Sequence, residues 1–276
     1  MILNQPASPR GEEGVERNVG QGPIGNHDYS LSLQLTPHRS EQHPVAHVLI
    51  SGATGFLGRT LTKTLLSRGH RVRALVRGAA SDTRLHFLQT RVPPGCEAVA
   101  GDPLDPAAYG AALTGIETLV QLVGVSHPNP SKAAQFRIVD LAAAKAAIEA
   151  ARNSGVRHFV YVSVAQPAPV MQEYIAVRSQ VEAAIREAEL NTTILRPWYV
   201  VGPGRRWPLL LAPVYWVLSA LPPTRESARR LGLLSLDEMV QTMALAVEQP
   251  PAGIRILEVP QIRSIGRVTP GSRLNQ

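Results

Sequence analysis

Three glycines at regular spacing constrain the fold of this chain more than any other feature of its sequence. They lie in the segment SGATGFLG, residues 51–58, between an apolar run at 47–50 and a series of leucines at helical spacing. A backbone that turns from a strand into a helix beneath a phosphate needs residues without Cβ, and the helix N-terminus offers free N–H groups to an anion. The strand–loop–helix context therefore predicts a dinucleotide-binding loop and disfavours a purely structural turn.

Each glycine of this loop has an expected role. Gly52 should make the turn, Gly55 should allow a pyrophosphate to approach the backbone, and Gly58 should let the helix pack closely on the sheet. The cofactor-binding residues expected in the loop are Gly52, Thr54, Gly55, Phe56, Leu57 and Gly58.

Strands and helices alternate along the chain from residue 45 onward. Apolar runs predict strands at 47–50, 71–77, 97–101, 117–124, 156–164, 192–201 and 254–259. Helical patterns are predicted at 107–113, 131–151, 173–188 and 235–248, the last opened by a capping box at Ser235 and Glu238. This alternation predicts an α/β fold, a doubly wound and mostly parallel sheet of the Rossmann type.

The two ends of the chain lack this alternation. Residues 1–44 contain many breakers of regular structure, which predicts a disordered tail, and a mis-set start codon would produce the same pattern. The dinucleotide-binding domain is expected at 45–263, with 201–234 as a segment that caps the substrate pocket. Residues 264–276 are expected to form a flexible C-terminal tail.

The formal net charge of +7 raises the question of a nucleic-acid or anionic-membrane partner. No basic run exceeds two residues and aromatic residues do not alternate with the arginines, so we favour a pocket for a polyanionic cofactor and expect no nucleic acid. The single cysteine, Cys96, has no partner for an internal disulfide, and no Cys/His cluster indicates a metal. Without a recognisable signal peptide or an apolar run of spanning length, the expected location is the cytoplasm.

The second predicted strand ends in Arg77, 19 residues after Gly58. An NAD-binding protein usually has Asp or Glu at this place, where the carboxylate accepts hydrogen bonds from the adenosine ribose. A carboxylate would repel a 2′-phosphate, whereas a guanidinium binds it with a charge-assisted pair. Arg77 therefore favours NADP over NAD, the alternative being a solvated arginine at the end of a strand.

On these motifs the chain resembles the atypical, NmrA-like branch of the short-chain dehydrogenases/reductases, over about residues 45–262. The matching motifs are SGATGFLG at 51–58, GDPLD at 101–105, LVG at 122–124, YVSV at 161–164 and LRPWYVVGPG at 195–204. The branch includes small NAD(P)H-dependent reductases, redox-sensing regulators and accessory proteins of respiratory complex I. These motifs are specific for the fold and carry no information on the substrate.

The resemblance implies further cofactor contacts. Asp102 would hydrogen-bond the adenine, although a GDPLD segment would also make a good turn in which the carboxylate has only a local role. Val123 and Gly124 would lie beside the cofactor ribose, and the backbone from Pro197 to Val200 would lie beside the nicotinamide.

The resemblance also implies a catalytic set, from which this chain departs at one position. Short-chain reductases use a Ser that polarises the carbonyl, a Tyr that moves the proton, and a Lys four residues after the Tyr. Ser163 and Tyr174 match the first two, and residue 178, one helical turn after Tyr174, is Arg178. Arginine keeps the charge that stabilises a tyrosinate and cannot release a proton. Catalysis by these residues and a purely structural Tyr–Arg pair therefore both stay open.

Two histidines and one apolar segment allow alternative readings. His127, in a loop before a proline, and His158, in a strand, are expected to be structural. The apolar segment at 209–221 is too short to span a bilayer. We favour its packing over a substrate pocket, and docking on a membrane surface is the alternative.

Three functions therefore remain. The favoured one is an NADPH-dependent reductase of a small apolar carbonyl, enone or quinone. The second is a non-catalytic NADP(H)-binding sensor or assembly factor, and the third is a membrane-surface protein docked through 209–221. The sequence indicates neither the substrate nor the oligomeric state.

Overall fold

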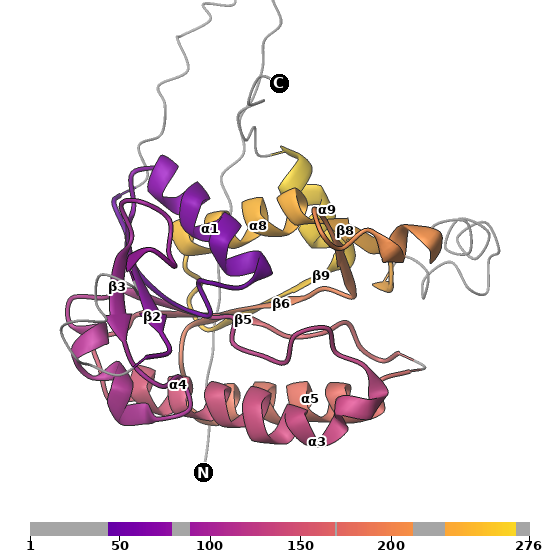
Figure 1. Cartoon of the computed structure of the whole chain (residues 1–276), viewed down its shortest axis with the longest axis horizontal. Helices are drawn as coiled ribbons and strands as arrows, with labels where there is room; N and C mark the ends of the chain where they lie inside the picture. Colours follow the sequence, from indigo (N-terminus) through magenta and orange to yellow (C-terminus); the bar gives the residue numbers. More distant parts are fainter. Residues whose placement is uncertain (1–43, 79–88, 169, 212–229, 269–276) are drawn as a thin grey trace, which may run out of the picture. The chain divides into compact units, whose positions relative to one another are not determined.

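The computed structural model describes residues 44–78, 89–168, 170–211 and 230–268. Seven strands form one sheet in the order β3-β2-β1-β4-β5-β6-β9, and every neighbouring pair is parallel (Figure 1). Their bounds are β1 His47–Ser51, β2 Arg71–Val76, β3 Glu97–Ala100, β4 Thr118–Gln121, β5 His158–Val162, β6 Thr192–Arg196 and β9 Ile254–Glu258. The strand order reverses between β1 and β4, so the predicted doubly wound Rossmann fold is confirmed.

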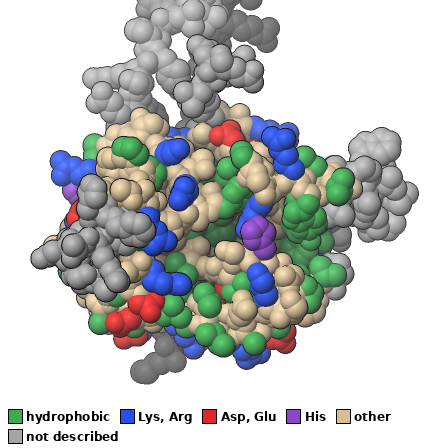
Figure 2. Space-filling model, viewed as in Figure 1, with side chains coloured by type: hydrophobic (Ala, Val, Ile, Leu, Met, Phe, Trp, Pro, Cys, Tyr) green, Lys and Arg blue, Asp and Glu red, His purple; other side chains and the backbone are tan. Residues whose placement is uncertain are grey.

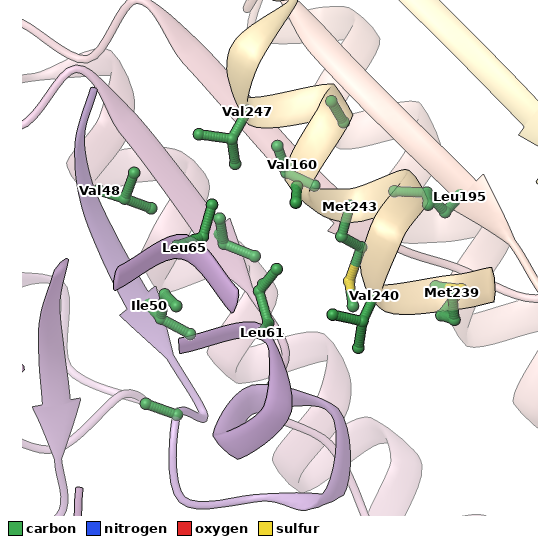
Figure 3. Close-up of a cluster of buried hydrophobic side chains, with 14 of the residues drawn as sticks. Val48, Ile50, Leu61, Leu65, Val160, Leu195, Met239, Val240, Met243 and Val247 are labelled. Carbon is green, nitrogen blue, oxygen red and sulfur yellow. The ribbon is translucent and has the colours of Figure 1, made fainter. Parts of the chain in front are cut away.

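Helices cover both faces of this sheet (Figure 1). Helices α1 (Phe56–Ser67), α8 (Leu236–Glu248) and α9 (Val259–Val268) lie on one face, and α4 (Ala142–Arg152) and α5 (Gln172–Glu187) lie on the other. Successive residues of a strand point to opposite faces of the sheet, and each face has its own hydrophobic core. Val48 and Ile50 lie in the core beneath α1 and α8, and Leu49 lies in the core beneath α4 and α5. Figure 3 shows Leu61 and Leu65 of α1 meeting side chains of α8 and of the strands.

The predicted strand at 192–201 is divided in the structure. The chain leaves the main sheet after β6, and β7 (Tyr199–Val201) pairs instead with β8 (Leu233–Ser235). Pro197 lies at the break and has no N–H to donate to a ladder, and its carbonyl accepts a hydrogen bond from Ala165 N–H at 2.9 Å. This departure from the sheet brings Pro197 and Val200 to the cleft described below.

The predicted helix at 131–151 is helical in the structure but not uniform. It consists of η3 (Pro130–Lys132), α3 (Ala133–Gln135), the π-helical turn η4 (Phe136–Leu141) and α4. Such π turns are frequent at functional sites, and this one carries Asp140, which is fully buried. The predicted helix at 107–113 is likewise two 3₁₀ turns, η1 (Pro106–Tyr109) and η2 (Ala111–Leu113).

The C-terminal part confirms one prediction and corrects another. The capping box is present, because Ser235 Oγ accepts from Glu238 N–H at 3.0 Å and the Glu238 carboxylate accepts from Ser235 N–H at 2.8 Å. The flexible tail expected from residue 264 is wrong for 264–268, which belong to α9. There, a Cβ on Gly266 would lie 2.5 Å from Glu238 Cα, so the two helices pack at close range.

Several expectations concern parts of the chain outside the described residues. These are the N-terminal tail up to residue 43, the end of the chain from 269, and all but the first three residues of the apolar segment at 209–221. Within the described ranges, no helix combines the length and apolar character needed to cross a bilayer.

Candidate active site

The glycine loop joins β1 to α1 and has the geometry expected of a phosphate-binding turn. Gly52 has a φ of 93°, and a Cβ on it would lie 2.8 Å from the carbonyl carbon of Leu122. A Cβ on Gly58 would lie 2.7 Å from Ala53 Cα, so this glycine lets α1 pack on its own loop. No side chain of the described residues caps α1, and its first turn contains no acid. The first N–H groups of α1 are therefore available to an anionic ligand.

A cleft of about 420 Å³ opens beside this loop. Its other walls come from the segments that follow β4, β5 and β6, as expected for a ligand site outside the carboxyl ends of parallel strands. Figure 2 shows a hollow near the centre of the side of the molecule that it presents, with hydrophobic side chains in the hollow and Lys or Arg side chains around it. The expected site residues that line the cleft are Gly52, Gly55, Phe56, Leu57, Gly58, Gly124, Ser163, Tyr174, Arg178, Pro197 and Val200.

The remaining expected cofactor residues, Thr54, Arg77, Asp102 and Val123, lie outside this lining. Arg77 directly follows β2, with its side chain exposed. Asp102 Oδ1 accepts a hydrogen bond from Leu104 N–H at 3.1 Å, which is the local turn role weighed as the alternative for this carboxylate. The contact of Asp102 with adenine and that of Arg77 with a 2′-phosphate stay predictions.

Tyr174 and Arg178 meet in the wall of the cleft. Arg178 Nη2 donates to the Tyr174 hydroxyl at 3.0 Å, and the guanidinium carbon lies 4.9 Å from the centre of the Tyr174 ring. The ring of Phe136 contacts Tyr174 edge-on, with centroids 5.0 Å apart. Because the tyrosine oxygen accepts the arginine hydrogen bond, its own proton can be donated to a ligand in the cleft.

Arg178 is buried and has several partners. Its Nη2 pairs with Asp140 Oδ1 at 2.6 Å, and its Nη1 donates to the Tyr161 hydroxyl and the Val162 carbonyl, both at 3.0 Å. Burial opposes the charged form of Arg178, but the surrounding Tyr161, Tyr174 and Asp140 raise its pKa. The guanidinium is therefore a permanent positive charge beneath the Tyr174 hydroxyl.

Asp140 connects Arg178 to the backbone that lines the cleft. Its Oδ2 accepts a hydrogen bond from Val125 N–H at 2.9 Å, and Val125 lines the cleft. A Cβ on Gly124 would lie 2.9 Å from both Arg178 Nη2 and Asp140 Oδ1. Glycine at position 124 therefore allows the chain after β4 to pass directly over the Arg178–Asp140 ion pair.

Ser163 lines the cleft, but its hydroxyl proton is directed elsewhere. Ser163 Oγ donates to Glu182 Oε1 at 2.7 Å, and Glu182 also accepts from Arg196 Nε at 2.9 Å. Burial would raise the pKa of Glu182, but the hydrogen bonds from Arg196 and Ser163 outweigh it and lower that pKa. A carboxylate acceptor thus holds the serine proton, so the expected role of Ser163 in polarising a carbonyl is not supported by this arrangement.

Aromatic side chains line the cleft from two segments that were expected near the ligands, 197–200 beside the nicotinamide and 201–234 over the substrate pocket. Trp198, Tyr199 and Trp207 form a series of edge-on aromatic contacts in the cleft wall, with centroids 5.4 Å and 5.1 Å apart. Arg205 lines the same cleft. Only their place after a motif strand could have pointed to these residues, because their side chains show no periodic pattern.

The two histidines behave differently. His127, expected to be structural, lies on the cleft lining and has a φ of 51°. His158 is buried on β5, where its Nε2 lies 3.1 Å from Thr193 Oγ1. Burial, and then the charge of Arg255, lowers the pKa of His158 to about 4, so it stays neutral near pH 7. His158 is absent from the cleft lining, and a structural role fits it.

Comparison with known proteins identifies relatives of this chain. The profile of the NAD(P)H-binding family matches residues 52–204. Ceramide reductase of Caulobacter vibrioides is 29% identical over 219 residues, which cover 79% of this chain and 66% of that protein. The photosystem II assembly factor Ycf39 of Cyanophora paradoxa is 31% identical over 150 residues, which cover 54% of this chain and 44% of that protein. The chain thus spans less than two thirds of the length of either relative.

The fold also has counterparts among solved structures. The enzyme WbmH of Bordetella bronchiseptica, solved in complex with NAD+, superposes with a TM-score of 0.57 at 18% identity. The superposition covers 81% of this chain and 80% of that one. At this level of identity the likeness extends to the fold alone.

Proposed function

Since this chain belongs to the NAD(P)H-binding family, among the atypical short-chain dehydrogenases/reductases, we propose that it is an NADPH-dependent reductase of a small apolar carbonyl, enone or quinone. The observation that carries the proposal is the contact between Arg178 and the Tyr174 hydroxyl in the cleft beside the glycine loop. A proton donor with a fixed cation beneath it, at the end of a dinucleotide site, is the arrangement that carbonyl reduction needs.

The described residues fit a bound dinucleotide. Gly52 and Gly58 leave no room for a side chain, and the first turn of α1 leaves its N–H groups uncapped. These groups would hold the pyrophosphate, and the segment from Pro197 to Val200 would lie beside the nicotinamide. The aromatic wall of Trp198, Tyr199 and Trp207 would cover an apolar substrate, because burial of apolar surface stabilises a complex by about 25 cal/mol per Å².

The residues of the cleft then divide the reduction between them. A dinucleotide held by the glycine loop would supply the hydride for this reduction when bound. Tyr174 donates its hydroxyl proton to the carbonyl oxygen, and the product is an alcohol. Arg178 stabilises the tyrosinate that is left, and since arginine keeps its proton, Tyr174 regains one from water in the open cleft.

A direct test measures NADPH oxidation by the full-length protein with a panel of apolar aldehydes, ketones, enones and quinones. We expect loss of NADPH absorbance with at least one class, and formation of the matching alcohol, saturated ketone or hydroquinone. Tight NADPH binding without oxidation by any member of the panel would contradict the reductase proposal.

NADPH should bind about ten- to a hundredfold more tightly than NADH, because Arg77 offers a cation to the 2′-phosphate. Arg77→Ala should remove this preference by weakening NADPH and leaving NADH unchanged. Arg71→Ala is the matched control, since Arg71 is also exposed on β2 but at its opposite end. Calorimetric titration of both cofactors measures the ratio, and equal affinities in the wild type would rule out this assignment.

A second function, a non-catalytic NADP(H)-binding assembly factor or sensor, has one specific observation in its favour. The Ser163 proton is held by Glu182, so this serine would give a substrate carbonyl no second hydrogen bond beside that of Tyr174. Ycf39, a relative over about half of this chain, is named an assembly factor. The oxidation panel separates the two functions, because both predict binding of NADPH and only the reductase predicts its consumption.

A further inference from the structure

A tight turn between β7 and η5 (Trp207–Leu211) fixes the backbone of Arg205. Arg205 N–H donates to the Gly202 carbonyl at 2.9 Å, and Gly202 N–H donates to the Arg205 carbonyl at 3.3 Å. Pro203 and Gly204 occupy the two central positions, and Gly204 has a φ of 76°. Proline followed by a glycine with positive φ is the sequence that a type II turn requires, so the turn holds Arg205 in one place.

The Arg205 side chain leads from this turn to the glycine loop. Its guanidinium carbon lies 4.9 Å from the centre of the Phe56 ring, and both residues line the cleft. Phe56 is the first residue of α1. The cation is therefore held by a ring that belongs to the phosphate-binding turn itself.

Arg205 differs in one respect from the other arginine of the cleft. Arg178 forms an ion pair with Asp140, whereas none of the ion pairs among the described residues involves Arg205. An arginine held in a cleft without an acidic partner in the described ranges, beside uncapped N–H groups, favours an anionic ligand between them.

We propose that Arg205 binds the pyrophosphate of the dinucleotide, together with the N–H groups of the first turn of α1. The inference rests on the proposed cofactor site and adds a residue to it from outside the glycine loop. A guanidinium can donate two parallel hydrogen bonds to a phosphate and carries a full positive charge, whereas the backbone N–H groups of the loop carry only partial charges. The turn at 202–205 thereby links the capping segment to the cofactor.

The test compares two fragments of the cofactor by calorimetric titration. ADP-ribose contains the pyrophosphate and lacks the nicotinamide, and adenosine 2′-phosphate contains neither the pyrophosphate nor the nicotinamide. Arg205→Ala should weaken ADP-ribose and NADPH by about tenfold or more and leave adenosine 2′-phosphate unchanged. Arg206→Ala is the control, since Arg206 is exposed and absent from the cleft lining.

Arg205→Lys tests the geometry of the contact in a variant that keeps the charge. It should bind ADP-ribose with an affinity between those of the wild type and Arg205→Ala, because lysine cannot form the two-pronged contact. Unchanged ADP-ribose affinity in both variants would overturn the inference. It would do so even if the variants raised the KM for a reducible substrate, because Arg205 would then bind an anionic group of the substrate instead of the pyrophosphate. Failure of the wild type to bind ADP-ribose and NADPH would instead overturn the dinucleotide site itself.

Discussion

Replacing Tyr174 with phenylalanine is expected to lower reductase turnover by about 10²–10⁴-fold, the usual contribution of a positioned general acid. The change removes only the hydroxyl that accepts the hydrogen bond of Arg178, and the ring contact with Phe136 can persist. NADPH affinity should stay unchanged, because Tyr174 is not among the expected cofactor contacts, which lie in the glycine loop, at Pro197–Val200 and at Arg77, Asp102, Val123 and Gly124. The measurement is kcat with the best substrate of the panel, together with the Kd of NADPH.

The control for this variant is Tyr199→Phe. Tyr199 also lines the cleft and contacts aromatic neighbours edge-on, and none of the hydrogen bonds described for the cleft involves its hydroxyl. Its loss should change kcat by less than about tenfold, well under the range expected of a general acid. If Tyr174→Phe retained full turnover, another group would have to protonate the substrate and Tyr174 would not be the acid.

The fold was predictable because its signals are local. The glycine loop, the seven strands and the capping box at Ser235 each follow from a few neighbouring residues, and all appear in the structure, although β4, β5 and β6 are shorter than the predicted runs. The break at Pro197 was also present in the sequence as a residue without an N–H, although the apolar run around it favoured one long strand. The helical end at 259–268 went unpredicted because its packing depends on α8.

The candidate site was predictable only where a motif carried it. Tyr174 and Arg178 were found by resemblance to the Tyr–Lys pair of short-chain reductases, whose one-turn spacing they match, and the structure brings them into contact. Asp140 had no signal, because a π turn buries it and its partner lies 38 positions away. Glu182 was also missed, because its partner Ser163 lies 19 positions away, and with it the fact that the Ser163 proton is already bound. Long-range pairs between charged residues leave no periodic trace in a single sequence.

The second prediction with a large expected effect concerns the stability of the fold, to which the Arg178–Asp140 ion pair contributes. Asp140→Ala should lower the free energy of unfolding by about 3–5 kcal/mol, because it leaves a buried guanidinium without its counter-charge. Hydrogen bonds from Arg178 to Tyr161 and Val162 persist, so the lower end of this range is expected. Urea denaturation measures the loss as a shift in the midpoint.

A surface pair between the same two elements gives a matched control for this loss. Arg137 in η4 and Glu173 in α5 are 3.1 Å apart, with side chains 58% and 55% exposed, so Glu173→Ala should cost about 0–1 kcal/mol. A loss of stability in Asp140→Ala that is no larger than the loss in Glu173→Ala would contradict the contribution of the buried pair.

The double variant Asp140→Leu with Arg178→Met should recover much of the lost stability, since it removes both charges together. It should not recover turnover, because Tyr174 would then lack the cation that stabilises its tyrosinate, and this separates the catalytic role of Arg178 from its contribution to stability.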